Sequence, residues 1–255
     1  FLFMHGGPSQ VETFDPKMSA PAEYRSTVGA IDTALLGVQI GSLLPRMAKV
    51  AYHMALVRSF AHTNSGHSGV THWVMTGYNH PPADAGAAPI KPSLGSITSR
   101  VRGASHRESG MPTYVRLNGI YGDGPSWLGT SYGPFESGGQ ARNNMNLQVD
   151  VNRLDNRRQL LKSLDGLDRA TDRSGLMAGL DEFEGQAFSL VLGQAKQAFD
   201  LQREDPRVRE LYGPGLGQQM LTARRLCEAG CGFVTIQYGG WDMHGDIVGG
   251  LKSRC

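Results

Sequence analysis

An aspartate and a histidine near the C-terminus have the residue types and spacing of a metal-binding pair. Asp242 and His244 lie two residues apart in the stretch GGWDMHG, which follows an apolar run at 232–237. A carboxylate oxygen and an imidazole nitrogen together suit a divalent ion such as zinc, manganese or calcium. The apolar run predicts a buried strand, and open α/β sheets bind ligands where strands end. The alternative is a polar turn in which Asp242 caps the following segment.

A dense group of histidines is the second set of candidate catalytic or metal-binding residues. Four of the eight histidines fall within twenty residues, and they are His62, His67, His72 and His80. Histidine near neutral pH can ligate a metal or carry protons. Ser65, Ser68 and Thr71 are candidate nucleophiles among them, provided that a metal or a base lowers the hydroxyl pKa. The alternative is a polar loop that exposes a few histidines.

The N-terminal segment brings an imidazole and two carboxylates directly after an apolar stretch. Residues 1–4 are FLFM, His5 opens a Gly-Gly-Pro turn, and Glu12 and Asp15 follow. Glycines let the backbone approach an anion or a metal closely. His5 and Glu12 are therefore candidate metal ligands, and the alternative is a Gly-Pro turn with a helix cap.

Three shorter motifs carry weaker signals. The stretch GHSGV at 66–70 lacks the final glycine of the nucleophile elbow of serine hydrolases. The stretch GPGLG at 213–217 lacks the Lys-Ser/Thr of a phosphate-binding loop and predicts a helix-entry turn. Cys227 and Cys231 lie four residues apart near a predicted helix end, where we expect them to be small packing residues.

The elements that must position these side chains alternate between strand and helix. Strands are predicted at 1–5, 53–59, 112–117 and 232–237. Helices are predicted at 43–51, 94–101 (with Ser93 as N-cap), 154–167, 181–201 and 216–229. A glycine-, serine- and asparagine-rich loop is expected at 118–145. This order predicts an α/β fold with a mostly parallel sheet flanked by helices, and a helical excursion over about 150–212.

The amino-acid composition favours a globular protein and gives no support for nucleic-acid binding or a membrane span. The chain has 255 residues, of which 40% are hydrophobic and 19% charged, which is typical of a globular protein, and we expect one domain over 1–255. The net charge of +2, with both signs interspersed, gives no electrostatic case for nucleic acid as a partner. No apolar run reaches the length of a membrane span, and the chain contains no visible signal peptide.

Several phrases, in order along nearly the whole chain, together resemble one family. They are GGPSQ at 6–10, TFDPK at 13–17, Arg58-Ser59 with His62 and His67, MTGY at 75–78, PSLGS at 92–96, Tyr212-Gly213, ARRL at 223–226 and GGWDMHG at 239–245. This pattern resembles the bacterial domain of unknown function 1501 family. That family is often called sulfatase-like and is grouped with the alkaline phosphatase superfamily.

The resemblance implies a metal-dependent hydrolase of phosphate or sulfate esters that acts on a small-molecule or polysaccharide substrate. It implies an alkaline-phosphatase-like fold and a periplasmic or secreted location. Carried over by position, Asp242 and His244 match a metal-binding pair, and Ser68 matches the nucleophile, with His67 and His72 beside it. The Asp-His spacing is tighter than in the superfamily, and His5 stands where an aspartate is expected. No cysteine lies near Ser68, which argues against a formylglycine sulfatase.

Two later phrases of the family, Gly-Glu-Phe-Gly-Arg and Gly-Arg-Asp-His-Trp, do not occur in the chain. Their absence predicts a fragment whose C-terminal part is missing and which is inactive by itself. Two other classes of function stay open. One is a non-catalytic secreted or envelope binding protein that keeps the fold, and the other is a metal-independent serine hydrolase that uses Ser68.

Overall fold

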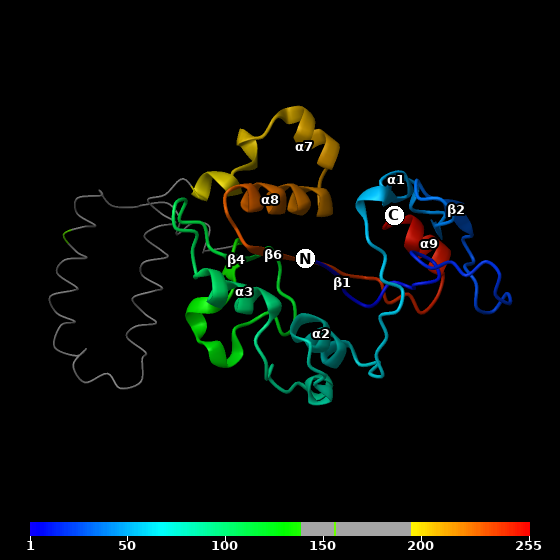
Figure 1. Cartoon of the computed structure of the whole chain (residues 1–255), viewed down its shortest axis with the longest axis horizontal. Coiled ribbons are helices and arrows are strands. Elements are labelled where there is room, and N and C mark those ends of the chain that lie inside the picture. The colour runs from blue at the N-terminus through cyan, green and yellow to red at the C-terminus, as the bar shows by residue number, and fades with distance from the viewer. Residues whose placement is uncertain (139–155, 157–194) are drawn as a thin grey trace. The chain divides into compact units, whose positions relative to one another are not determined.

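The computed structural model describes residues 1–138, Asn156 and 195–255 (Figure 1). The chain divides into two compact units. The first unit comprises Phe1–Phe3 and Ser65–Gln237, and the second comprises Met4–Asn64 and Tyr238–Cys255. Each unit is described by itself below.

A four-stranded sheet has the strand order β1-β6-β4-β5, and its strands are β1 (Leu2–Met4), β4 (Tyr114–Arg116), β5 (Phe135–Glu136) and β6 (Phe233–Tyr238). Strand β4 pairs in parallel with both β6 and β5. The Phe1 ammonium donates to the Val234 carbonyl, and the Ile236 N–H donates to the Phe1 carbonyl. The predicted α/β class with a parallel sheet flanked by helices is therefore confirmed.

The helices of the described residues are α1 (Pro45–Lys49), α2 (His67–Thr76), α3 (Leu94–Arg102), α7 (Pro206–Tyr212), α8 (Leu216–Glu228) and α9 (Ile247–Lys252). Short 3₁₀ turns are η1 (Ala51–His53), η2 (Pro81–Ala85), η3 (Ser126–Leu128), η4 (Thr130–Tyr132), η5 (Ala195–Phe199) and η6 (Leu201–Arg203). None of these helices is long and apolar enough to cross a membrane.

Helices α3 and α8 cover opposite faces of strand β4. Successive side chains of a strand point to opposite faces, so Tyr114 and Val115 face different helices. Gly95 of α3 packs so closely on the Tyr114 ring that an added Cβ would lie 2.5 Å from ring atoms. Val115 lies in a buried cluster with Leu226 of α8. A glycine at position 95 is therefore required by packing and not by backbone conformation.

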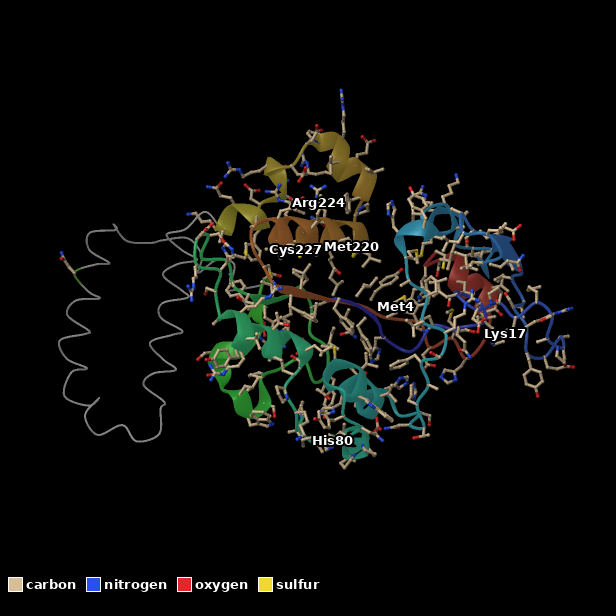
Figure 2. All side chains as sticks on the ribbon, viewed as in Figure 1. Met4, Lys17, His80, Met220, Arg224 and Cys227 are labelled. Atoms are coloured by element: carbon tan, nitrogen blue, oxygen red, sulfur yellow. The ribbon has the colours of Figure 1, made fainter. Side chains whose placement is uncertain are left out.

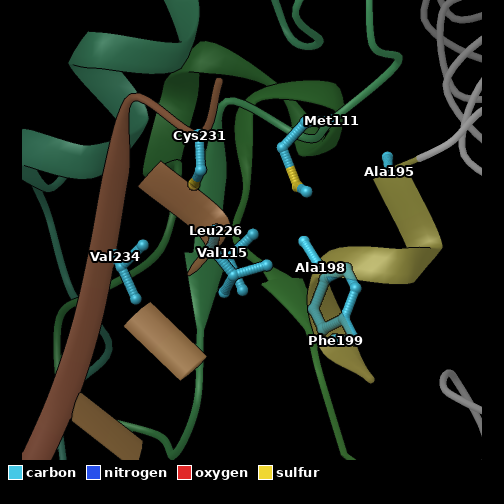
Figure 3. Close-up of a cluster of buried hydrophobic side chains, with 8 residues drawn as sticks. All are labelled: Met111, Val115, Ala195, Ala198, Phe199, Leu226, Cys231 and Val234. Carbon is cyan, nitrogen blue, oxygen red and sulfur yellow. The ribbon is translucent and has the colours of Figure 1, made fainter. Parts of the chain in front are cut away.

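The core of the first unit is a cluster of eight buried side chains on the α8 side of the sheet (Figure 3). The cluster is formed by Met111, Val115, Ala195, Ala198, Phe199, Leu226, Cys231 and Val234. All three cysteines of the chain are free. Burial raises the pKa of the Cys231 thiol to about 12, so this thiol stays protonated at neutral pH. Cys231 is thus a packing residue, as predicted, whereas the same prediction is wrong for Cys227, which is exposed.

Several predicted elements are confirmed by the structure. The helix predicted at 94–101 is α3, and the Ser93 hydroxyl caps it by accepting from the Ser96 N–H at 3.2 Å. The helix predicted at 216–229 is α8, and the strand predicted at 232–237 is β6. The helix predicted at 154–167 lies outside the described residues except for Asn156, and so do residues 181–194 of the helix predicted at 181–201 and most of the excursion over 150–212. Residues 195–201 do not continue that helix, because they form the 3₁₀ turn η5 and the start of η6, separated at Asp200.

The strand predicted at 53–59 is wrong. Residues 54–57 have no regular structure, and the segment pairs with no strand of the described residues. Val57 is 74% exposed, so the apolar run that suggested a buried strand does not enter a core. The second unit instead holds an unpredicted antiparallel pair, β2 (Ala30–Asp32) with β3 (Gln39–Gly41).

Candidate functional site

The loops that follow β1 and β6 lie side by side in the second unit. The His5 N–H donates to the Tyr238 carbonyl at 3.0 Å, and the Trp241 N–H donates to the His5 carbonyl at 3.2 Å. Gly6 has a φ of 99°, and an added Cβ there would lie 2.6 Å from the Asp242 nitrogen. Glycine is therefore needed at position 6 for both its conformation and its contact. The structure brings two separate candidate segments, at His5 and Asp242, to the same place.

Asp242 and His244 contact each other directly. The Asp242 Oδ2 lies 3.0 Å from the His244 Nε2, and the two side chains are 41% and 87% exposed. This separation is that of a hydrogen bond between the two side chains. It also lies in the range of roughly 3.0 to 3.4 Å that separates two ligands bound to one ion at about 2.1 Å. Trp241, which directly precedes Asp242, is buried and packs edge-on against Tyr238, with ring centroids 5.7 Å apart. The buried ring anchors the exposed turn.

Glu12 is placed differently from the Asp242–His244 pair. It is 3% exposed, and both carboxylate oxygens accept hydrogen bonds from one loop of the same unit. The donors are the Ser26 hydroxyl, the Thr27 N–H and hydroxyl, and the Val28 N–H, at 2.7 to 3.2 Å. Burial by itself raises the pKa of Glu12, but the hydrogen bonds from Thr27, Ser26 and Val28 outweigh it and lower the pKa below its usual range. Glu12 thus organises the loop at 26–28.

Replacing Glu12 with glutamine is expected to lower the free energy of unfolding by about 1 to 3 kcal/mol, because an amide turns one acceptor into a donor facing other donors. A lowered folded-state pKa means that ionised Glu12 stabilises the fold above its unfolded pKa. That contribution is lost as the pH falls through the folded-state pKa. Urea unfolding at neutral and mildly acidic pH measures both effects. The exposed Glu23→Gln is the control, and equal loss in both variants would contradict this role.

Ser68 lies in the first turn of helix α2 in the first unit. The N–H groups of Ser68 and Gly69 both donate to the Asp84 Oδ1, at 2.8 and 3.0 Å. The same carboxylate fills the space that a side chain on Gly66, the N-cap residue, would need. A carboxylate is favoured at a helix N-terminus because it meets unpaired N–H groups and the positive end of the helix dipole. Asp84, which the sequence alone did not single out, therefore fixes the start of α2.

The other two candidate nucleophiles differ from Ser68 in their surroundings. Thr71 is buried, and its hydroxyl donates to the His67 carbonyl at 2.6 Å within the helix. Ser65 is exposed and precedes the helix, whereas Ser68 is half-buried within it. Thr71 is thereby committed to helix structure, and Ser68 has the more defined position of the remaining two.

His72 is fully buried, and both of its ring nitrogens are engaged by backbone groups. Its Nδ1 lies 2.8 Å from the Tyr78 carbonyl, and its Nε2 lies 3.3 Å from the Ile90 N–H. These partners assign a donor at Nδ1 and an acceptor at Nε2. His67 is exposed at the start of α2. The hydrogen bonds of the His72 ring nitrogens therefore go to partners other than Ser68.

The candidate residues thus fall into two sets. His5, Glu12, Asp242 and His244 belong to the second unit, and His67, Ser68 and His72 belong to the first. Across residues 1–138 and 195–255, no three or more His, Cys, Asp or Glu side chains converge as a group that could hold a metal. Asp242 and His244 are a converging pair, and His5 contributes its backbone to the same place.

The end of strand β4 carries two polar residues that the sequence had placed only in a long loop. Asn118 donates from its amide to the Gln237 carbonyl at 2.7 Å and accepts from the Gln237 N–H at 2.6 Å, as a strand backbone would. Asp123 is buried and accepts from Arg116 at 2.8 Å. Burial raises the pKa of Asp123 above its usual range despite the neighbouring Arg116. Both residues stabilise the segment that follows strand β4 through these hydrogen bonds.

The protein is of the α/β class, with a parallel sheet. Polar, glycine-rich segments follow the carboxyl ends of its strands, and proteins of this class bind ligands there. The chain belongs to the family described as a protein of unknown function (DUF1501), whose model matches residues 1–255. The family resemblance of the sequence motifs is therefore confirmed. No curated protein and no solved structure matches the chain.

Proposed function

We propose that this protein is a metal-dependent hydrolase of phosphate or sulfate esters with an alkaline-phosphatase- or sulfatase-like fold. The observation that carries the proposal is the Asp242–His244 pair, held 3.0 Å apart beyond the end of β6 and against the glycine turn that follows β1. A carboxylate and an imidazole that follow a strand of a parallel sheet along the chain suit this chemistry.

Asp242 and His244 would hold the divalent ion, and His5 is the candidate imidazole whose backbone pairs with the same segment. The ion, whether zinc, calcium or manganese, would supply positive charge for the oxyanion that develops on phosphorus or sulfur. We leave Glu12 and His72 out of the reacting set because their polar atoms already bind backbone and hydroxyl groups.

Ser68 would be the nucleophile, and the exposed His67 beside it would take or return the proton of the hydroxyl. The first N–H groups of α2 already bind the Asp84 carboxylate, so the negative charge of a bound ester would be met by the metal ion and not by this helix N-terminus. The family resemblance extends the proposal to a small-molecule or polysaccharide ester as substrate and to a periplasmic or secreted location.

Turnover of a panel of esters by the full-length protein tests the function. Aryl sulfates, phosphate monoesters and phosphate diesters are each assayed with zinc, manganese and calcium. We expect turnover of one ester class, its loss on chelation, and its return when the metal is restored. No turnover of any ester under these conditions would overturn the hydrolase and favour a binding protein that keeps the fold. Turnover that survives chelation would favour a serine hydrolase instead.

A further inference from the structure

A cavity of about 540 Å³ lies within the second unit, apart from the Asp242–His244 pair. It forms between the segment at 8–17, which follows the glycine turn, and the segment at 57–62. This volume lies in the range of about 300 to 1,000 Å³ that is common for sites of small organic ligands. The cavity is large enough for one ring-sized molecule.

One wall of the cavity carries more positive than negative charge. The Lys17 Nζ lies 2.7 Å from the Asp15 Oδ2, and the Arg58 Nη1 lies 3.8 Å from the Asp15 Oδ1. Two cations therefore share one carboxylate, which leaves one net positive charge among the three. The Arg58 contact is too long for a hydrogen bond, so Asp15 does not saturate the guanidinium.

Arg58 is also held in place. Its Nη2 donates to the Gln39 carbonyl at 2.8 Å, while its side chain stays 40% exposed. A guanidinium fixed at one nitrogen loses less freedom when it binds an anion with its remaining N–H groups. Arginine in such a position favours planar or tetrahedral oxyanions, which accept two parallel hydrogen bonds.

Lys17 has a backbone conformation that costs free energy. Its φ is 45°, in the left-handed region, where a residue with a side chain loses about 1 to 2 kcal/mol relative to a right-handed conformation. Hydrogen bonds on both sides hold the turn, from the Ala20 N–H to the Lys17 carbonyl and from the Ser26 N–H to the Pro16 carbonyl. Figure 2 marks Lys17 on the segment that follows strand β1. Strain of this kind concentrates at functional sites.

The rest of the lining combines apolar side chains with the polar residues Gln10, Thr13 and His62. Phe14, Val57 and Phe60 contribute to the cavity wall, and Val57 and Phe60 are 74% and 69% exposed. Large exposed apolar side chains beside a fixed cation match a ligand with an apolar ring and one charged substituent. Covering them would remove apolar surface from water, which stabilises a complex.

We propose that this cavity binds a ring-sized organic oxyanion, with the anion on Arg58 and Lys17 and the ring against Phe14, Val57 and Phe60. The shared chemistry is a carboxylate, a sulfur oxyanion or a phosphorus oxyanion on one apolar ring. The site is separate from ester hydrolysis, because neither Arg58 nor Lys17 belongs to the proposed reacting set.

Binding of benzoate, benzenesulfonate and phenylphosphonate to the full chain, measured by titration calorimetry, tests the site. None of these compounds is an ester, so the result does not depend on hydrolysis. We expect saturable binding of at least one of them and much weaker binding of benzyl alcohol, which keeps the ring and lacks the charge. The strongest of the three identifies the preferred oxyanion.

Arg58→Gln is expected to weaken that binding about tenfold or more, and Lys17→Gln about threefold or more, because each removes a charge-assisted hydrogen bond. The matched controls are Arg46→Gln and Lys49→Gln, exposed cations of helix α1 that do not line the cavity. Circular dichroism checks the fold of each variant. If Arg58→Gln does not fold, the affinities of Arg58→Lys and Lys17→Gln for the anions test the proposal instead. Unchanged affinity in the folded cavity variants, equal binding of benzyl alcohol, or no binding of any anion would overturn the proposal.

Discussion

Replacing Ser68 with alanine is expected to lower kcat for the proposed ester hydrolysis by about a thousandfold or more, because removing the proposed covalent nucleophile leaves only the contributions of binding and charge stabilisation. KM is expected to change much less. The measurement is steady-state turnover of the best ester of the panel at saturating metal.

Ser68→Ala is expected to remove the hydroxyl without disturbing the local structure. Asp84 binds the backbone N–H of Ser68 and not its hydroxyl, so alanine leaves the start of helix α2 intact. Ser65→Ala and Thr71→Val are the matched controls, since their hydroxyls lie before α2 and within its buried face. Both are expected to keep most of the turnover. Full activity of Ser68→Ala beside loss of activity in Ser65→Ala would transfer the nucleophile to Ser65.

Replacing Asp242 or His244 with alanine is expected to weaken binding of the divalent ion about a hundredfold or more, since each change removes a proposed direct ligand. Loss of an outer-shell partner alone costs about 10- to 100-fold. Turnover at low metal concentration falls in parallel. Metal content after dialysis and titration with zinc, manganese and calcium measure the effect. The side chains are 41% and 87% exposed, so the free energy of unfolding of the metal-free protein changes little.

Asp246 provides the control for that experiment. It lies in the same segment, and its Oδ1 accepts from the Gly249 N–H at 3.1 Å at the start of helix α9. Asp246→Ala removes a nearby carboxylate and a helix cap, with an expected stability loss of about 1 kcal/mol, but keeps Asp242 and His244, the proposed ligands. Unchanged metal content in both Asp242→Ala and His244→Ala would reject the ligand assignment. Loss of metal in Asp246→Ala alone would indicate that Asp246, and not Asp242 or His244, binds the ion.

Much of the fold could be predicted from local patterns. Helix α8 follows a 3.6-residue apolar repeat, and α3 begins at a serine whose hydroxyl caps it. Strand β6 is an apolar run that fits a strand buried on both faces of a parallel sheet. These signals are local, because each depends on residues within one or two turns or along a single strand.

The incorrect prediction at 53–59 and the missed pair of β2 and β3 have a common cause. An apolar run forms a strand only if another strand offers hydrogen-bonding groups beside it, and the run itself does not reveal the partner. Residues 54–57 have no such partner among the described residues, whereas residues 30–32 and 39–41 pair with each other. The histidine-rich segment likewise becomes helix α2 from His67 onward, where Asp84 satisfies its first N–H groups.

The sequence by itself determined the strand that leads to Asp242 and His244, the spacing of that pair, and the family to which the chain belongs. Only the tertiary structure decided which polar residues are already engaged. Glu12 meets the loop at 26–28, and Asp84 meets the start of α2 sixteen residues earlier. Gly6 and Asp242, far apart in sequence, lie in contact. The physical reason is that a side chain's hydrogen-bond partners and burial depend on segments that meet only when the chain folds.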